Sequence, residues 1–279
     1  MEAERVTDAV AYHGEGPVWS EAWGGLRWVD MLGGDILSLA RDGAVERRHV
    51  SAVVAALRPR RAGGAVLGIE RGFALEEPDG TIVRLDEVWT GDEVRMNEGA
   101  CDPDGRFYCG SMAYDKRPGG GALYRLDPDL SVHRVLEGVT VSNGLDWSPD
   151  GALAYYNDTD THRTDVFDYD GDAGLTGRRP FAEIPGRPDG LTVDAEGGVW
   201  IALSDAGQMR RYSAEGALEA MIDLPVTKVA ACTFGGPRLE DLFITTSREG
   251  LPDSAEPEAG SLFRARPGVA GLPVRDFGG

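Results

Sequence analysis

The stretch RMNEGACDPDGRFYCG, at residues 95–110, recurs in altered form twice further along the chain. Its turn DPDG ends at Gly105, and the related turns SPDG and DAEG end at Gly151 and Gly197. These glycines follow one another at intervals of 46 residues, and a short run of β-branched and aromatic residues follows each turn. A fixed period in the forties is typical of β-propeller blades, each made of four antiparallel strands.

A second set of turn signals lies between these turns, in LYRLDPD (123–129), VFDYDGD (166–172) and MRRYSAEG (209–216). We interpret them as outer hairpins of the same blades. Dividing the 279 residues of the chain by the repeat length gives about six blades. Because no linker or low-complexity tract interrupts the pattern, we predict an all-β, six-bladed β-propeller with four antiparallel strands per blade. We expect it to form a single domain over residues 1–279.

The overall charge excludes several classes of partner. The chain has 47 Asp and Glu against 28 Lys and Arg, a formal net charge of -19. Such a surface repels nucleic acid and anionic membranes. No apolar run approaches the roughly 20 residues of a membrane span, and the acidic N-terminus does not read as a signal peptide. Three cysteines without a CxxC motif suit a reducing compartment, so we expect a cytoplasmic protein, a monomer or weak homodimer.

Polar residues occupy one position of the repeat. Asn97, Asn143 and Asp189 each lie eight residues before the turn glycine of their repeat, and Glu15 lies 82 residues before Asn97, about two slightly shorter blades. Each has a glycine at the next residue or the one after it. In a propeller this position is the entry into the innermost strand, and rotational symmetry brings such positions together beside the central axis.

Two carboxylates and two amides that meet at one point require a counter-charge, and a divalent cation supplies it. The donors are all oxygens, which suits Ca²⁺, Mg²⁺ or Mn²⁺, and Zn²⁺ or Fe²⁺ can also occupy such a set. A single Asn or Asp before a glycine is more often a turn residue than a metal ligand. The alternative is therefore that these side chains only cap the tops of the inner strands.

The chain resembles, nearly end to end, the gluconolactonase family that includes senescence marker protein (regucalcin) and luciferin-regenerating enzyme. The resemblance lies in an ordered series of stretches: GEGPVW (14–19), RMNEGACDPDGRFYCGSMA (95–113), GALYRLDPD (121–129), VSNGLDWSPD (141–150), FDYD (167–170), RPDGLTVDAEGGVWIA (187–202) and FGG (234–236). Members of that family are six-bladed propellers with one divalent metal ion in the axial channel.

The resemblance implies a role for each matching residue. It makes Glu15, Asn143 and Asp189 the metal ligands. It makes Arg95, Asn97 and Asp115 substrate-binding residues, with Asp115 on a loop that covers the site. From the chemistry of lactone hydrolysis we expect Asp189 also to act as a general base toward the attacking water. Two departures weaken the transfer of an exact substrate: Glu98 stands where the family commonly has Asp, and the loop at 114–121 is short and rich in glycine.

The function predicted from these features is metal-dependent hydrolysis of a sugar lactone, such as an aldonolactone, to the sugar acid. Neither a GxSxG nor an HExxH motif occurs, which argues against a serine hydrolase and against a zinc protease. Two alternatives remain. One is a metal-dependent esterase or organophosphate hydrolase, and the other is a calcium-binding regulator without turnover.

Overall fold

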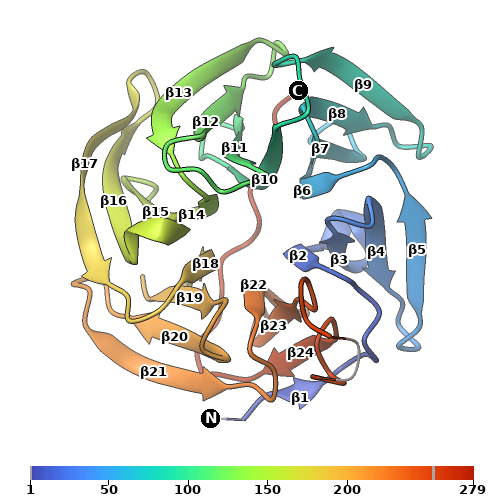
Figure 1. The fold of residues 1–279 in the computed structure, drawn as a ribbon, viewed down its shortest axis with the longest axis vertical. Helices are drawn as coiled ribbons and strands as arrows, with labels where there is room; N and C mark the ends of the chain where they lie inside the picture. Colours follow the sequence, from blue (N-terminus) through green and yellow to red (C-terminus); the bar gives the residue numbers. More distant parts are fainter. Residues whose placement is uncertain (1, 253–254) are drawn as a thin grey trace.

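The computed structural model describes residues 2–252 and 255–279, and it confirms a ring of six four-stranded antiparallel sheets (Figure 1). In the first five blades the first strand is innermost and each following strand lies further out. The first blade comprises β2 (Gly14–Ser20), β3 (Gly25–Asp30), β4 (Asp35–Leu39) and β5 (Val45–His49). The second comprises β6 (Val54–Pro59), β7 (Ala65–Ile69), β8 (Gly72–Glu76) and β9 (Ile82–Glu87). The third comprises β10 (Val94–Cys101), β11 (Phe107–Ala113), β12 (Gly121–Leu126) and β13 (Val132–Val139). The fourth blade comprises β14 (Ser142–Trp147), β15 (Leu153–Asp158), β16 (Arg163–Asp170) and β17 (Gly174–Glu183). The fifth comprises β18 (Pro188–Val193), β19 (Val199–Leu203), β20 (Gln208–Tyr212) and β21 (Leu218–Asp223).

The sixth blade joins the two ends of the chain. Its inner strands are β22 (Val229–Gly235), β23 (Asp241–Thr246) and β24 (Leu262–Ala265), and its outermost strand is β1 (Glu4–Arg5) from the beginning of the sequence. The pairing aligns Glu4 with Arg264 and Arg5 with Phe263. Because the first strand completes the last blade, backbone hydrogen bonds close the ring.

The turns that carry the repeat are built as the sequence predicts. Gly105, Gly151 and Gly197 have φ angles of 81°, 74° and 85°, a left-handed conformation that glycine adopts without steric cost. Each ends the hairpin between the first and second strand of its blade. The stretches interpreted as outer hairpins do connect the third and fourth strands of their blades.

Aromatic side chains pack between neighbouring blades. Trp19 of the first blade stacks on Phe243 of the sixth, with ring centroids 6.0 Å apart. Trp147 of the fourth blade meets Tyr108 of the third at 5.6 Å, and Trp200 of the fifth lies 6.2 Å from Phe234 of the sixth. Such pairs bury large apolar surfaces where two twisted sheets face one another.

The C-terminal segment 266–279 crosses the far end of the central channel. Figure 1 shows it as the red trace that passes behind the centre of the ring from β24 toward β10. Arg275 Nη1 donates to Asp146 Oδ1 at 3.3 Å, and the Phe277 and Gly278 amides donate to the Pro59 and Gly105 carbonyls at 2.8 Å. The tail therefore closes this end of the channel, so that a ligand reaches the axis from the opposite face.

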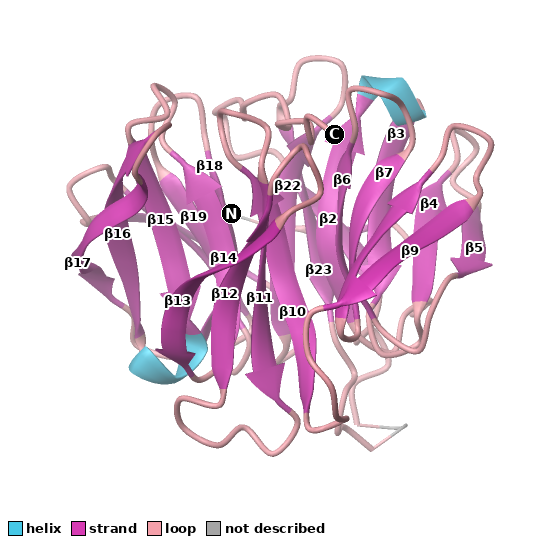
Figure 2. Cartoon of the chain, turned by 90° about the horizontal axis from the view of Figure 1, so that it is seen from above, coloured by secondary structure: helices cyan, strands magenta, loops and turns pink. Residues whose placement is uncertain are grey.

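Loops occupy both faces of the ring, and the two short 3-10 helices η1 (Glu21–Trp23) and η2 (Thr159–Thr161) lie on opposite faces (Figure 2). Within residues 2–252 and 255–279 there is no helix of the length and apolar character that crossing a membrane requires.

Replacing Phe277 by Ala tests the structural contribution of the tail. The Phe277 ring is fully buried in an apolar cluster that includes Phe107 and Leu126. We expect the free energy of unfolding to fall by about 3–4 kcal/mol, the cost of deleting a buried aromatic ring, measured by urea denaturation. Leu218→Ala, at an exposed position of β21, is the control. Equal midpoints for Phe277→Ala and the unsubstituted protein would show that the tail contributes nothing to the cooperative fold.

Candidate metal and substrate site

The entrance ends of the inner strands surround a cavity of about 310 Å³ on the axis of the ring. Glu15 of β2, Asn97 of β10, Asn143 of β14 and Asp189 of β18 all line it. The structure thus brings together four residues that are far apart in the sequence. In the inner strand β22 the cavity wall is Ala230, which offers no side-chain oxygen.

A bulge in each inner strand turns these side chains toward the axis. The pairing of β10 with β11 is interrupted between Met96 and Gly99, and β14 and β18 are interrupted at the equivalent points. A bulge bends the strand and re-aims its side chains. Neighbouring inner strands also approach one another closely. As a result, a Cβ atom on Gly144 or Gly190 would lie only 2.5 Å from an atom of the next inner strand. Glycine beside the polar residue is therefore a steric requirement.

Carboxylates at the ends of second strands hold the segments that enter the inner strands. Asp30, the last residue of β3, accepts hydrogen bonds from the backbone amides of Tyr12 and His13 at 3.0 and 2.9 Å. Asp158, the last residue of β15, accepts from Thr140 and Val141 in the same way. These bonds position the residues that come next in the chain, Glu15 and Asn143.

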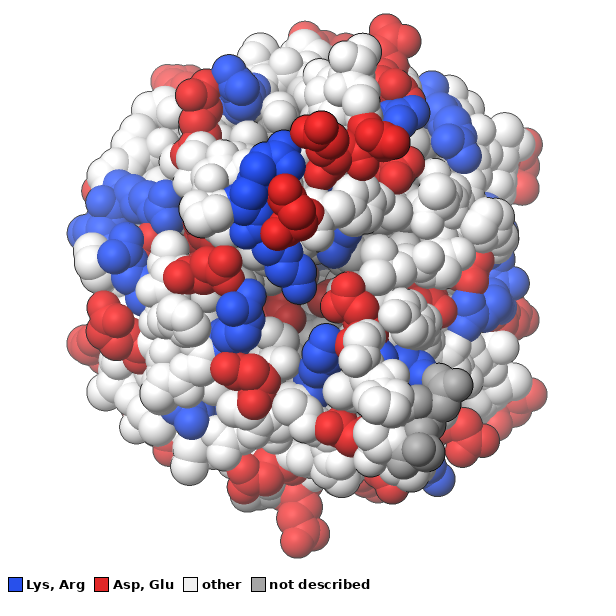
Figure 3. Space-filling model, in the orientation of Figure 1, with Lys and Arg blue, Asp and Glu red and all other residues white. Residues whose placement is uncertain are grey.

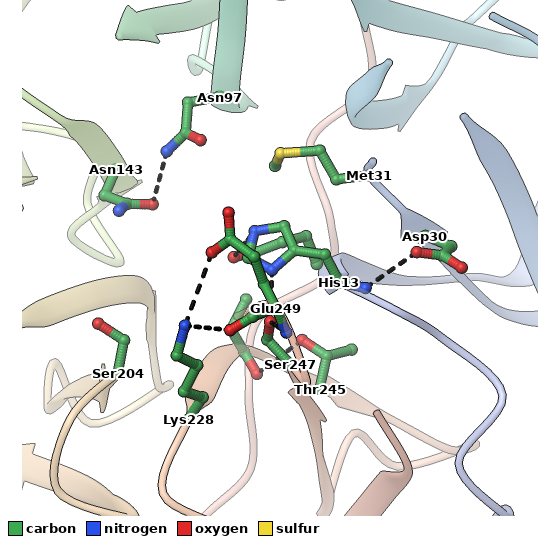
Figure 4. A network of polar contacts seen from close by, with 12 residues as sticks. His13, Asp30, Met31, Asn97, Asn143, Ser204, Lys228, Thr245, Ser247 and Glu249 are labelled. Carbon is green, nitrogen blue, oxygen red and sulfur yellow. Dashed lines mark hydrogen bonds and ion pairs between the residues drawn. The ribbon is translucent and has the colours of Figure 1, made fainter. Parts of the chain in front are cut away.

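A chain of hydrogen bonds runs across three blades along the cavity wall. Arg95 Nη1 donates to Asn97 Oδ1 at 2.6 Å, and Asn97 Nδ2 donates to Asn143 Oδ1 at 3.2 Å (Figure 4). Asn143 Nδ2 donates to Thr159 Oγ1 at 2.8 Å, and that hydroxyl donates to the Pro188 carbonyl. These bonds orient both amides, and Asn143 Oδ1, which accepts one hydrogen bond from Asn97, keeps a second lone pair for a ligand.

Three buried carboxyl groups share the axis, and among the described residues none of them forms an ion pair with a lysine or an arginine. Burial, followed by repulsion from Asp189 and Glu98, raises the pKa of Glu15 well above its usual range. Burial and the charge of Glu98 raise the pKa of Asp189 to about 8, and burial raises the pKa of Glu98 to about 7. Glu15 Oε2 is buried and has no hydrogen-bond partner. An unpaired buried acceptor among like charges is costly, and a cation would remove that cost.

The donor set accordingly fits a hard divalent cation. Glu15, Asn143 and Asp189 offer only oxygens, which is the ligand chemistry of Ca²⁺, Mg²⁺ and Mn²⁺. In the part of the chain that the structure describes, no group of three His, Cys, Asp or Glu side chains is arranged to hold a metal ion. The candidate site therefore depends on one amide oxygen in addition to its two carboxylates.

His13 also faces the cavity. Its Nδ1 lies 2.6 Å from Ser247 Oγ, and its Nε2 lies 3.6 Å from Glu15 Oε1. Burial lowers the pKa of His13 to about 4, so the ring is neutral at pH 7. The contact with Glu15 makes His13 a neighbour of a candidate metal ligand.

The loop predicted to cover the site contributes a different residue from the one expected. Asp115 is exposed, and its carboxylate accepts hydrogen bonds from the backbone and side chain of Arg117, both at 3.1 Å. The neighbouring residue Lys116 lines the cavity instead. Lys228 and Glu249, which the sequence analysis missed, also line it. They come from loops outside the repeated motif, so the periodicity carried no signal for them.

Comparison with known proteins gives consistent results. The family model described as SMP-30/Gluconolactonase/LRE-like region matches residues 13–248. Regucalcin of the rabbit, Oryctolagus cuniculus, is 36% identical over 285 residues, which cover 95% of each chain. The structure of a luciferin-regenerating enzyme superposes with a TM-score of 0.91 at 28% identity and covers 99% of both chains. That of a gluconolactonase from Xanthomonas campestris gives a TM-score of 0.78 at 25% identity, covering 94% of this chain and 88% of the other.

Replacing Glu15 by Gln tests whether the cavity is built for a cation. In EDTA we expect the variant to melt at a higher temperature than the unsubstituted protein, because glutamine avoids the cost of either burying a carboxylate or protonating it on folding. A cation at about 100 times its Kd stabilises a protein by about 2.7 kcal/mol, so Ca²⁺ or Mn²⁺ should raise the Tm of the unsubstituted chain by roughly 5 °C. Differential scanning fluorimetry measures both effects.

We expect the metal-induced rise in Tm to be largely lost in Glu15→Gln. Glu21→Gln, at an exposed position in η1, is the control and should keep the full rise. A Glu15→Gln variant that gains as much thermal stability from the cation as the control would show that the ion binds elsewhere.

Proposed function

The chain belongs to the SMP-30/gluconolactonase/LRE-like family, and on this premise we propose that it hydrolyses a sugar lactone with the help of one divalent metal ion. The observation that carries the proposal is the convergence of Glu15, Asn143 and Asp189 on one cavity, where the two buried carboxyl groups have no lysine or arginine partner among the described residues and Glu15 Oε2 has no hydrogen bond. An aldonolactone such as gluconolactone is the substrate class that the family name supports.

In this proposal Glu15, Asn143 and Asp189 hold the metal ion, which would be Ca²⁺, Zn²⁺, Mn²⁺, Mg²⁺ or Fe²⁺. A bound divalent ion polarises a carbonyl group and makes a neighbouring water more acidic. Three protein ligands leave room beside the ion for a substrate and a water molecule. The hydrogen bond from Asn143 Nδ2 to Thr159 keeps the amide oxygen directed to the ion rather than to the wall.

Side chains of the cavity carry out the proton transfer and bind the sugar. Asp189 accepts the proton of the attacking water at its carboxylate and returns it to the ring oxygen as the ester bond breaks. Among the described residues, Arg95 donates hydrogen bonds only through Nη1. Its Nε and Nη2 groups can therefore donate to the hydroxyl groups of the sugar. Asn97, held by Arg95 on one side and Asn143 on the other, orients the substrate beside them.

We assign Asp115 a role through its loop. Its carboxylate binds the backbone amide of Arg117 and so shapes the turn that points Lys116 at the cavity mouth. We also propose a cytoplasmic location, since Cys101, Cys109 and Cys232 are free and buried, and a monomeric or weakly dimeric state.

Replacing Asp189 by Asn tests the catalytic assignment. We expect kcat for aldonolactone hydrolysis at saturating metal to fall by at least about 100-fold, the usual contribution of a general base. Acid release measured at constant pH, over several aldonolactones and divalent metals, gives the rates. Asp172→Asn, at an exposed turn, is the control and should retain full activity. Near-normal kcat in Asp189→Asn would refute the role of Asp189.

Chelation separates the lactonase from the alternatives. EDTA should abolish turnover, and adding back the metal should restore it. If the chain binds Ca²⁺ but never exceeds the spontaneous rate with any lactone, the result would support a calcium-binding regulator instead. Hydrolysis of simple esters or organophosphates in preference to lactones would support the broader esterase.

A further inference from the structure

The two lysines of the chain face the same cavity. The sequence contains 28 Lys and Arg in total, and only Lys116 and Lys228 are lysines. Both line the axial cavity, although they lie 112 residues apart in the sequence and on different blades. The cationic residues elsewhere on the surface are all arginines, so the presence of lysine at the mouth of the site calls for an explanation in terms of its chemistry.

The local structure directs each lysine to the cavity. Lys116 lies on the loop between β11 and β12 with φ of 55°, a left-handed conformation that residues other than glycine seldom adopt. It is exposed, and its ammonium group has no hydrogen bond or ion pair to a described residue. Lys228 precedes β22, and its Nζ donates to the Glu249 carbonyl at 2.6 Å and lies 3.7 Å from a carboxylate oxygen of the same residue (Figure 4).

The charge of the cavity differs from that of the molecule. Four basic and four acidic side chains line it: Arg95, Lys116, Arg187 and Lys228, and Glu15, Asp189, Asp205 and Glu249. Asp160 lies outside the lining but pairs with Arg187 at 2.6 Å, so with a divalent cation these side chains would sum to a charge of plus one, in a chain whose net charge is -19. Figure 3 shows Lys and Arg side chains, interspersed with Asp and Glu, around the hollow at the centre of this face. A neutral sugar lactone makes no use of such an excess.

The choice of lysine indicates what the excess charge would bind. The ammonium group is a compact point charge with three donors on a flexible stem, and it binds phosphate or carboxylate without the fixed planar geometry of arginine. Lys228 is already oriented by Glu249, while Lys116 is free to approach a ligand from the opposite side of the mouth. A bound divalent ion would balance Glu15 and Asp189 deeper in the cavity, which leaves the two lysines as binding groups for an anion at the mouth.

We propose that the substrate is a lactone that also carries an anionic group, a phosphate or a second carboxylate, and that Lys116 and Lys228 bind this group at the cavity mouth. The lactone ring then lies deeper, over Glu15, Asn143 and Asp189. This inference rests on the proposed lactonase function and specifies its substrate class.

Binding of stable sugar acids, which are the products of such lactones, tests the inference without turnover. Isothermal titration calorimetry on the metal-loaded protein compares an aldonic acid, an aldaric acid with two carboxylates, and an aldonic acid phosphorylated at its far end. We expect at least one of the two more highly charged acids to bind roughly tenfold or more tightly than the simple aldonic acid, as two charge-assisted hydrogen bonds would allow. Preference between these two identifies phosphate or carboxylate as the group recognised.

Substitutions locate the binding. We expect Lys116→Gln and Lys228→Gln each to remove most of the preference for the charged acid, and Lys116→Arg to restore part of it. Arg238→Gln is the control, because it removes one positive charge from an exposed loop that follows β22 at the far end of the ring. That variant should keep the preference unchanged. Raising the salt concentration should weaken the charged ligands more than the simple acid.

Chemical labelling gives a second readout from the unsubstituted protein. Because Lys116 and Lys228 are the only lysines, an amine-directed reagent reports on the cavity mouth and on the α-amino group alone. The preferred sugar acid should slow the labelling of both lysines and leave the labelling of the α-amino group unaffected. Mass spectrometry measures the extent of labelling at each amine.

Equal affinity for all three acids, unchanged in Lys116→Gln and without protection of either lysine, would overturn the inference. Its failure is distinct from failure of the lactonase proposal. Metal-dependent hydrolysis of neutral lactones with no preference for charged ones would remove this inference alone. Lysine-dependent binding of the charged acids without hydrolysis of any lactone would instead remove the enzymatic proposal and leave the anion site.

Discussion

Crowding of like charges on the axis is the constraint on which the rest of this structure depends. The inner strands approach so closely that no side chain fits at Gly144 or Gly190, and the same geometry forces Glu15, Asp189 and Glu98 into mutual repulsion away from water. A propeller core has no need of such groups for packing, since the aromatic contacts between blades already supply it. Buried carboxylates at this point make physical sense when a cation joins them.

The scaffold holds this unfavourable arrangement by tying each element to its neighbour. Asp30 and Asp158 bind the amides of the entering segments, and the hydrogen bonds from Arg95 through Asn97 and Asn143 to Thr159 connect three blades. The N-terminal strand completes the last blade, and the C-terminal tail closes the far end of the channel. The ring is thus fastened at its perimeter and at its base, while the cavity stays open on one face.

The cavity has a floor and a rim of different origin. The floor is made by equivalent positions of the inner strands, and the relatives with similar rings share this framework. The rim is made by loops between strands, with Lys116 from the third blade and Lys228 and Glu249 from loops that flank β22 and β23 of the sixth. A hydrolytic site on the floor and recognition at the rim would let substrate preference vary while the strands stay the same, because loop changes leave the strand register untouched.

The ring and the polar positions around its axis could be predicted from the sequence alone. A period of 46 residues repeats one backbone environment, so Asn97, Asn143 and Asp189 meet wherever the blades meet, and Glu15 joined them through its spacing of about two slightly shorter blades and its neighbouring glycine. Which loop residue turns inward became visible in the folded structure. It placed Lys116 in the cavity and Asp115 outside, left Glu15 Oε2 without a partner, and laid the tail across the channel. Symmetry relates residues inside the repeat, whereas the direction of a loop depends on packing that no periodic pattern encodes.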